Sequence, residues 1–338
     1  MAGVYEVDQV GKREELADII ANIIATETPF TSMLKKSKKP NQILMSYQSE
    51  VYPDFALAGI VDGTDVSTYS NQAPRYLIEA VGQQFRAPWQ VTTIADATVV
   101  AGLGGAGEVA RQKYASLINL KRIMERRFLS AEECSLDDKS ASPYATRGAL
   151  EWIKASAHSV KPVNAALVNN SASIYTSALS SFTEAAFKTM IAQAAKERNA
   201  SVNLFGLVGP LLKNVIDAWT VTADAGSANA TFPVRQYNQN AESKQLINVV
   251  DKLRFSEGTV DLMTSYHLAR DASDGTETDY SSRSGLFLDM SKWDQAAMEM
   301  PVHKDLPDLG GGPRGYYRSI CGLRCYNPLG QLEVYTNT

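Results

Sequence analysis

The chain has 338 residues, of which 44% are hydrophobic and 21% charged, enough for a sizeable core in one elaborated domain or two. With a net charge of −4, the chain lacks the global positive electrostatic field that is typical of proteins that coat nucleic acid. No segment has the pattern of a signal peptide, and no apolar run approaches the roughly 20 residues that a membrane span needs, so we predict no membrane contact. Three cysteines are too few for a disulfide framework and fit a reducing cytoplasm. The composition therefore indicates a mixed helix and sheet protein.

The N-terminal part of the chain predicts a short amphipathic helix over residues 12–25, because its isoleucines recur at three-to-four spacing. Pro29 bars continuation of this helix. A lysine cluster follows and ends at Pro40, its members being Lys35, Lys36, Lys38 and Lys39.

Two alternating segments then predict strands, one over 43–51 and one over 76–80. The residues between them, from Pro53 to Pro74, are polar and form a gap that is too long for a compact domain. We therefore predict a projecting hairpin that another subunit covers.

The strongest helical pattern runs from Gly107 to about Cys134 and has a continuous apolar stripe. At roughly 27 residues and 40 Å it exceeds the usual helix length, which indicates a strut rather than a packing element of a small domain. The region 136–181 is polar with weak periodicity.

Later elements follow from caps, turns and periodicity. We predict a helix that a capping box of Ser181 and Glu184 begins and that ends near Arg198, a strand over 204–208, a helix from Pro210 through Trp219, a hairpin over 253–263, a short helix that Ser291 opens and that contains Trp293, and a final hairpin made of 316–326 and 332–336.

This order of elements resembles the Hong Kong 97-type capsid fold. The segment ELADIIANIIATETPFTSMLKKSKK (15–39) resembles the opening of the phage SU-type major head proteins. The segments KLRFSEGTVDLMTSYHL (252–268) and GLFLDMSKWDQAAM (285–298) resemble axial-domain strands followed by a late, tryptophan-bearing helix.

The resemblance implies an α+β protein that self-assembles into an icosahedral shell of hexamers and pentamers, with a portal at one vertex. It implies a virion component that is assembled in the host bacterial cytoplasm, with a scaffolding protein, a possible decoration protein and packaged double-stranded DNA held by non-specific contacts only. A scaffold fused to the chain is expected to be absent or already removed. The expected parts are an N-terminal arm (1–40), an extended hairpin loop (41–95), a peripheral domain with the spine helix (96–150), an axial domain (151–310) and a C-terminal hairpin that returns to the peripheral domain (311–338).

The expected contact residues follow from this division. Arm residues that we expect to touch neighbouring subunits are Ile19, Ile23, Pro29, Phe30, Lys35, Lys36, Lys38 and Lys39, and residues of the extended loop are Tyr47, Tyr52, Phe55 and Tyr69. The apolar arm residues have a second interpretation, as an intramolecular dock, and the lysines could form a solvated face, contact acidic neighbours or line the DNA-facing wall.

The glycine run from Gly102 to Gly107 matches G-x-G-x-x-G and opens a helix, as a dinucleotide-binding turn does. The helix is too long for that fold, and Glu125 falls inside it rather than after a second strand. We therefore interpret Gly102, Gly104 and Gly105 as a hinge.

The remaining chemical patterns favour no catalytic, cofactor-binding or metal site. The histidines His158, His267 and His303 are scattered. Cys321 and Cys325 would lie about 13 Å apart on a strand and cannot pair unless the strand breaks at Gly322, so we predict free, buried side chains. Asp271, Asp274, Glu277 and Asp279 lack the spacing of a calcium loop.

The leading hypothesis is thus a phage major capsid protein that is not an enzyme. A shell protein of a cellular nanocompartment on the same fold is the first alternative. A nucleotide-binding enzyme that uses the glycine run is the second.

Overall fold

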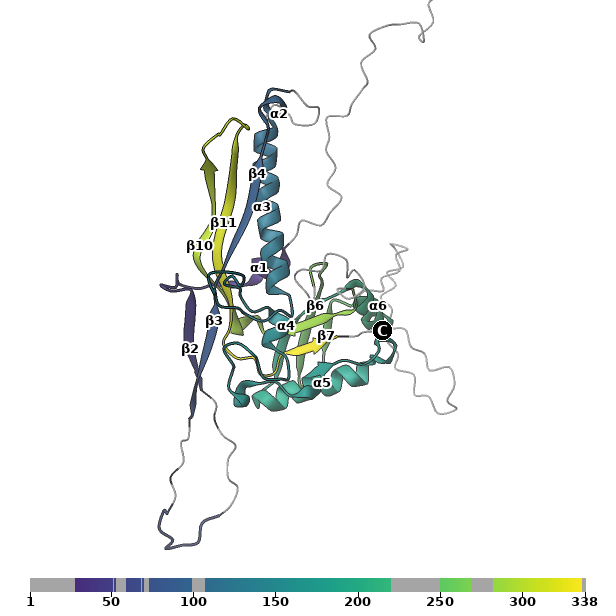
Figure 1. Cartoon of the computed structure of the whole chain (residues 1–338). Coiled ribbons are helices and arrows are strands. Elements are labelled where there is room, and N and C mark those ends of the chain that lie inside the picture. Colours follow the sequence, from purple (N-terminus) through teal and green to yellow (C-terminus); the bar gives the residue numbers. More distant parts are fainter. Residues whose placement is uncertain are drawn as a thin grey trace, which may run out of the picture. The chain divides into compact units, whose positions relative to one another are not determined.

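The computed structural model describes residues 28–50, 52, 59–67, 69, 73–98, 107–219, 250–268 and 282–335. The chain divides into two compact units (Figure 1). The described residues of the first unit are 86–98, 107–120 and 301–318, and the second unit holds the others. Four long elements contribute residues to both units: α3 (Gly107–Phe128), β4 (Gln83–Gln90), β10 (Trp293–Leu306) and β11 (Arg314–Cys325).

The first unit packs α3 against strands in the order β10-β11-β4. Along β4 the side chains of Ala87 and Trp89 are buried while the residues between them are exposed, so one face of the strand packs inward. The Ser116 hydroxyl of α3 donates a 2.7 Å hydrogen bond to the Ala87 carbonyl oxygen. The Trp89 indole N–H donates a 3.1 Å hydrogen bond to His303 Nε2, which links β4 to β10. A one-turn helix, α2 (Thr93–Ala97), follows β4 and is capped by Thr92.

The long strut helix is confirmed, although it ends earlier than expected. α3 has 22 residues and is about 33 Å long. It stops at Phe128 rather than near Cys134 because the next residues pair with a distant segment: Gly148 N–H donates to the Glu132 carbonyl, and Ser135 forms an antiparallel bridge with Ala145. No helix in the described part of the chain is long and apolar enough to cross a membrane.

The second unit is built on a mixed sheet with strand order β5-β12-β9-β6-β8-β7. The central strand β6 pairs parallel with β8 and antiparallel with β9. The predicted strand over 204–208 and the predicted hairpin over 253–263 are both confirmed as members of this sheet. Its strands are β5 (Ile174–Tyr175), β6 (Val202–Val208), β7 (Lys252–Arg254), β8 (Gly258–Thr264), β9 (Gly285–Leu288) and β12 (Leu332–Val334).

Two helices, α5 (Glu184–Arg198) and α6 (Pro210–Ala218), bury their apolar sides in the core of this sheet. Both helices were predicted, but the predicted N-cap residue of α5, Ser181, was wrong. The Thr183 hydroxyl accepts the Ala186 N–H and caps the helix, because Ser181 belongs to a preceding 3-10 turn, η4 (Leu179–Ser181). Shorter elements are α4 (Ala149–Trp152), η2 (Ala165–Leu167), η3 (Ser171–Ser173) and η5 (Met290–Lys292).

The predicted hairpin of the extended loop is confirmed. β2 (Leu44–Glu50) and β3 (Arg75–Val81) pair antiparallel over seven residues, and Figure 1 shows them extending away from the six-stranded sheet of the same unit. The far end is held by an ion pair between Arg75 and Glu50. β4, which the expected loop range 41–95 also contains, belongs instead to the four-stranded sheet.

Two predictions near the C-terminus were wrong. Trp293 does not lie in a helix; it begins the strand β10, which pairs with β11 and, at its start, with the two-residue strand β1 (Lys35–Lys36). The final hairpin does not form either, because β11 pairs with β10 and β4 whereas β12 pairs with β9 and β5.

Candidate assembly elements and a buried charged cluster

The short helix α1 (Pro29–Met33) is fixed to α3 through one carboxylate. The backbone N–H groups of Phe30 and Thr31 donate to the two oxygens of Glu125 at 2.8 and 2.7 Å, and the Thr31 hydroxyl adds a third hydrogen bond at 2.5 Å. These donors are the free amides of a helix N-terminus that begins with proline. The Phe30 ring packs edge-on against Trp293, with 6.4 Å between centroids. The segment is therefore anchored by both polar and apolar contacts.

Burial dominates the electrostatics of this anchor and raises the pKa of Glu125, while the hydrogen bonds from Thr31 and Phe30 oppose that rise. A buried carboxylate of this kind depends on its donors, because water does not reach it.

The arm residues that were predicted to touch neighbouring subunits differ in their burial. Phe30 is 0% exposed, which favours the intramolecular dock, and Pro29 begins α1. Lys35, Lys36, Lys38 and Lys39 are all exposed, and Lys35 and Lys36 pair in register with Asp294 and Gln295 of β10. Ile19, Ile23 and the predicted helix over 12–25 lie outside the described residues.

The base of the projecting hairpin is fixed by Tyr47. Its hydroxyl donates to the Cys325 carbonyl oxygen at 2.6 Å, and its ring contacts Tyr326 with centroids 5.2 Å apart. Burial raises the pKa of the Tyr47 hydroxyl well above its usual value. Tyr47 is thus half-buried in its own chain and holds the hairpin on β11.

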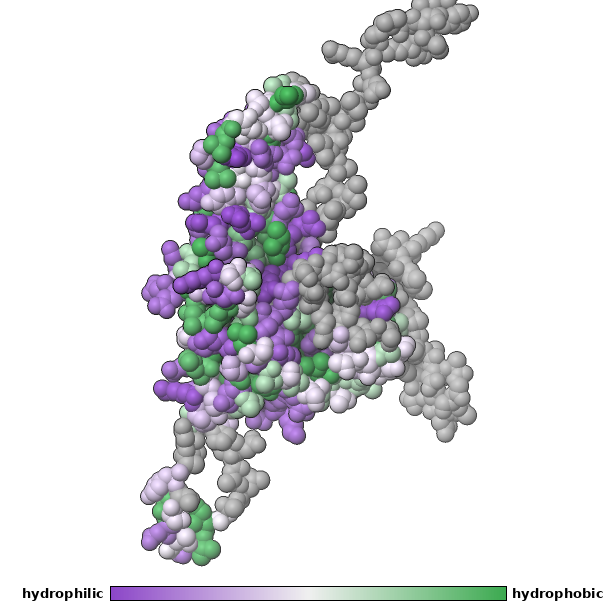
Figure 2. All heavy atoms as spheres, viewed as in Figure 1, coloured by the Kyte–Doolittle hydropathy of each residue, from purple (hydrophilic) through white to green (hydrophobic). Residues whose placement is uncertain are grey.

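Beyond the strands, the described loop residues expose several aliphatic side chains. Ile60, Val61 and Val66 are 84%, 77% and 67% exposed, and Figure 2 shows apolar side chains at this end of the hairpin. Tyr52 and Tyr69 are also exposed, whereas Phe55 lies outside the described residues.

The predicted hinge lies largely outside the described residues, since Gly102, Gly104 and Gly105 are not among them. Gly107, the last glycine of the run, begins α3 with a φ of +77°, a conformation that favours glycine. The four acidic residues of the supposed calcium loop, Asp271 to Asp279, also fall outside.

The outer face of the sheet in the first unit mixes apolar and cationic groups. Val302 and Leu306 are exposed on β10, and Arg86 of β4 lies over the Tyr316 ring of β11 at 5.9 Å. Lys304 is exposed between the two aliphatic residues. The face therefore presents apolar surface flanked by positive charge; we refer to Arg86, Val302, Lys304, Leu306 and Tyr316 as the outer strip.

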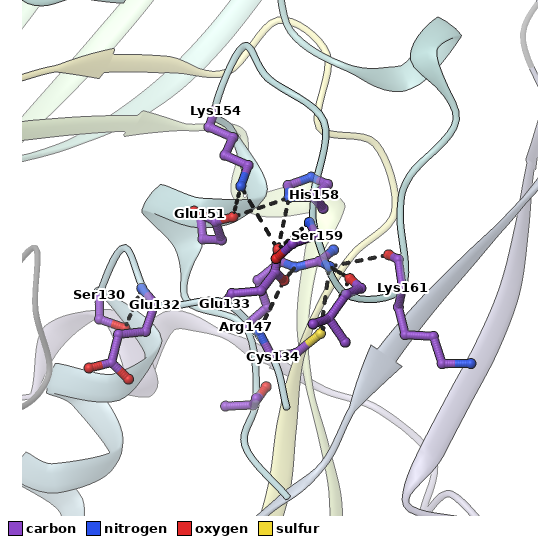
Figure 3. Close-up of polar contacts among 12 residues, drawn as sticks. Ser130, Glu132, Glu133, Cys134, Arg147, Glu151, Lys154, His158, Ser159 and Lys161 are labelled. Carbon is purple, nitrogen blue, oxygen red and sulfur yellow. Dashed lines mark hydrogen bonds and ion pairs between the residues drawn. The ribbon is translucent and has the colours of Figure 1, made fainter. Parts of the chain in front are cut away.

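A buried charged cluster lies in the second unit, in the region that showed only weak periodicity (Figure 3). Arg147 donates to Glu133 Oε1 at 2.6 Å and stacks over Trp152, with 4.5 Å to the ring centroid. On the other side, Lys154 contacts both Glu133 Oε2 and Glu151 Oε1. His158 Nδ1 lies 3.4 Å from Glu151 Oε1 and 3.7 Å from Glu133 Oε2. Two carboxylates, two cations and one imidazole thus share one site.

The electrostatics of this cluster favour the ionised form of Glu133. Burial would raise the pKa of Glu133, but the Arg147 guanidinium, through its charge and its hydrogen bond, lowers that pKa to about 2. Burial raises the pKa of the adjacent Cys134 thiol to about 11.

The sequence did not reveal this cluster, because its members are spread over 26 positions of polar sequence and only α4 gives them local order. The spacing of Arg147, Glu151, Lys154 and His158 would suit one face of a longer helix, but α4 covers only Ala149–Trp152, so this spacing is not what brings them together. His158 contacts Glu151 and Trp152. His303 contacts Asp305 and Trp89. Cys321 and Cys325 are free and buried, as predicted.

Similar folds occur among solved phage capsids. The "Cyanophage A-1(L) capsid asymmetric unit" has a TM-score of 0.62 at 10% identity and covers 98% of this chain and 99% of that one. The "Capsid of native GTA particle computed with C5 symmetry" has a TM-score of 0.57 at 11% identity, with 98% of each chain covered. "Mycobacterium phage Che8" has a TM-score of 0.53 at 13% identity, with 97% of each chain covered.

These structural similarities, which extend over nearly the whole chain, establish the fold as the Hong Kong 97 type. No curated protein matches the sequence. The family model described as "SU10 major capsid protein" matches residues 3–331, which is nearly the whole chain. The chain therefore belongs to the SU10 major capsid protein family.

Proposed function

We propose that neighbouring subunits of the icosahedral phage head formed by this major capsid protein are joined by the hairpin loop of one copy and the outer strip of the next. The observation that carries this proposal is the exposure of aliphatic side chains on both surfaces. Exposed aliphatic side chains that gather on one surface mark sites of association.

The chemistry of the loop matches that of the strip. The loop sequence from Gly59 to Ser67 carries two acids, Asp62 and Asp65, and no lysine or arginine. The strip carries Arg86 and Lys304 beside its aliphatic residues. Apolar contact would supply affinity, while the opposite charges would fix the orientation of the two surfaces.

A charge-reversal cycle tests this pairing. The double variant Asp62→Lys/Asp65→Lys and the double variant Arg86→Glu/Lys304→Glu should each assemble poorly. The four-fold combination should regain assembly, because the charges are again opposite. Shell formation is measured by sedimentation and electron microscopy.

A control places one charge reversal of the same kind elsewhere, with half the change in net charge of the Arg86→Glu/Lys304→Glu variant. Lys188→Glu lies on an exposed position of α5, outside both surfaces, and should assemble normally. Normal assembly of both double variants, or no recovery in the combination, would contradict the proposed contact.

The arm is proposed to act together with this contact. Residues 1–27, with Ile19 and Ile23, would contact a neighbour, and the segment that follows them, α1, is fixed within the subunit. The exposed side chains of Lys35, Lys36, Lys38 and Lys39 would contact acidic surfaces or packaged DNA without sequence preference. Replacing the four lysines by glutamine should make assembly or DNA retention less sensitive to salt, and an unchanged salt dependence would contradict this role.

The other partners follow from the family rather than from any contact in the subunit. We infer a portal at one vertex, a scaffolding protein and assembly in the bacterial cytoplasm, and a decoration protein is a further candidate partner. A purely structural role without catalysis is supported by the family. Co-expression with candidate scaffold and portal genes, read out as closed heads, tests these partners.

A further inference from the structure

The buried charged cluster offers three metal-ligating groups from three separate segments. Glu133 follows α3, Glu151 lies in α4, and His158 lies in the loop beyond it. One ligand atom of each lies within 4.8 Å of the other two. The His158 side chain is only 2% exposed and points its Nδ1 at both carboxylates (Figure 3). We infer that Glu133, Glu151 and His158 form a site for a zinc ion that replaces the ammonium group of Lys154.

The separations are compatible with shared ligation as well as with a long hydrogen bond between His158 and Glu151. His158 Nδ1 is 3.4 Å from Glu151 Oε1 and 3.7 Å from Glu133 Oε2. Good N–H···O bonds measure about 2.7 to 3.2 Å, and one N–H serves one acceptor well. Ligands of a tetrahedral zinc ion with bonds near 2.1 Å are about 3.4 Å apart, which is close to both separations.

A cation already occupies this position. Lys154 Nζ contacts the same two oxygen atoms that face His158, Glu133 Oε2 and Glu151 Oε1. Because Arg147 and Lys154 together neutralise the two carboxylates, a metal ion must displace one of them. Arg147 is 1% exposed and Lys154 is 25% exposed, so Lys154 is the group that moves into solvent.

The remaining contacts would orient the ligands. Arg147 holds the other oxygen of Glu133, and the Ser159 N–H donates to Glu133 Oε2 at 3.2 Å. Such outer hydrogen bonds fix the direction of a metal-bound carboxylate. An imidazole nitrogen with two carboxylate oxygens suits zinc, whereas calcium and magnesium favour all-oxygen sites.

Isothermal titration calorimetry of the full chain, stripped with a chelator and dialysed, tests the site with zinc chloride. We expect one zinc ion per chain. Glu151→Gln and His158→Gln should each weaken binding at least tenfold. Lys154→Gln should strengthen it roughly tenfold, because the competing ammonium group is gone. His303→Gln, which removes an imidazole in the other unit, should leave it unchanged.

The gain expected for Lys154→Gln keeps the test valid if a ligand variant folds poorly, as circular dichroism would reveal. Absence of zinc binding to the unmodified chain at about 100 μM would overturn the proposal. So would binding that survives His158→Gln in a folded protein, or a Lys154→Gln variant that binds no more tightly. Equally tight binding of magnesium would overturn the assignment to zinc.

Discussion

The amide of Phe30 and the carboxylate of Glu125 are 95 positions apart in sequence and 2.8 Å apart in space. This hydrogen bond joins the short helix α1 to the long helix α3. Its position beneath a fully buried phenylalanine makes the carboxylate a structural group, which gives the first prediction.

Replacing Glu125 by alanine should destabilise the unassembled subunit by about 2–4 kcal/mol. The N–H groups of Phe30 and Thr31 would lose their acceptor in a buried place, and unpaired buried donors cost about 1–3 kcal/mol each. Thr31→Val, which removes only the hydroxyl donor, should cost about 1 kcal/mol. Urea unfolding curves measure both, and equal losses would show that the backbone bonds contribute little.

Acid should weaken the buried charged cluster. Because the pKa of Glu133 falls from 4.5 to about 2 on folding, the folded state binds fewer protons between these values. The stabilisation by Glu133 is therefore complete above pH 4.5 and is lost as the pH falls toward 2. In chelator-treated samples, Glu133→Gln should flatten the pH dependence of the unfolding free energy over this range. An unchanged slope would show that Glu133 is not held by Arg147.

The tip between β10 and β11 should not tolerate a side chain at Gly312. Its φ of +97° is strained for other residues, and an added Cβ would lie 2.3 Å from the Val91 carbonyl oxygen. Gly312→Ala should lower the melting temperature of the subunit by several degrees, the shift that a loss of about 2 kcal/mol causes. Gly311→Ala is the matched control, since its nearest neighbour is the flexible end of the Gln90 side chain. Similar losses in both variants would contradict this account.

The three thiols should resist modification in the folded subunit. Burial raises the pKa of Cys134, Cys321 and Cys325, so little thiolate forms near neutral pH. Ellman's reagent should react slowly with the native chain and with three thiols per chain in urea. Rapid reaction before unfolding would mean that one of these sites opens readily.

Periodicity identified the elements whose local sequence pattern is sufficient to specify a helix or a strand. The apolar stripe of α3, the alternation in β2 and β3 and the buried run of β6 all appear as predicted. The prediction of a helix around Trp293 was wrong because the residues after it, Asp294 to Met298, include several good helix formers. Pairing with β1 and β11 overrides that preference, and such partners are invisible in the local sequence.

The same reason explains the missed site. Glu133, Glu151 and His158 come together because the chain after α3 turns back to pair Ser135 with Ala145. Phe30 was identified as an anchor, but the sequence left open whether its partner belonged to the same chain. The aromatic partner, Trp293, lies in the strand that was mistaken for a helix.

The parallel pairing of β1 with β10 also affects the order of events during synthesis. Ser37 hydrogen-bonds to Gln295, which is 258 positions later in the chain. At translation rates of about 5 to 20 residues per second, about 10 to 50 s separate the emergence of these partners from the ribosome. Until then β1 has no strand to join and the Phe30 ring has no Trp293 to pack against. A chain truncated before β10 therefore keeps only the hydrogen bonds from α1 to Glu125, and the full set of contacts around α1 and β1 forms only after β10 has been made.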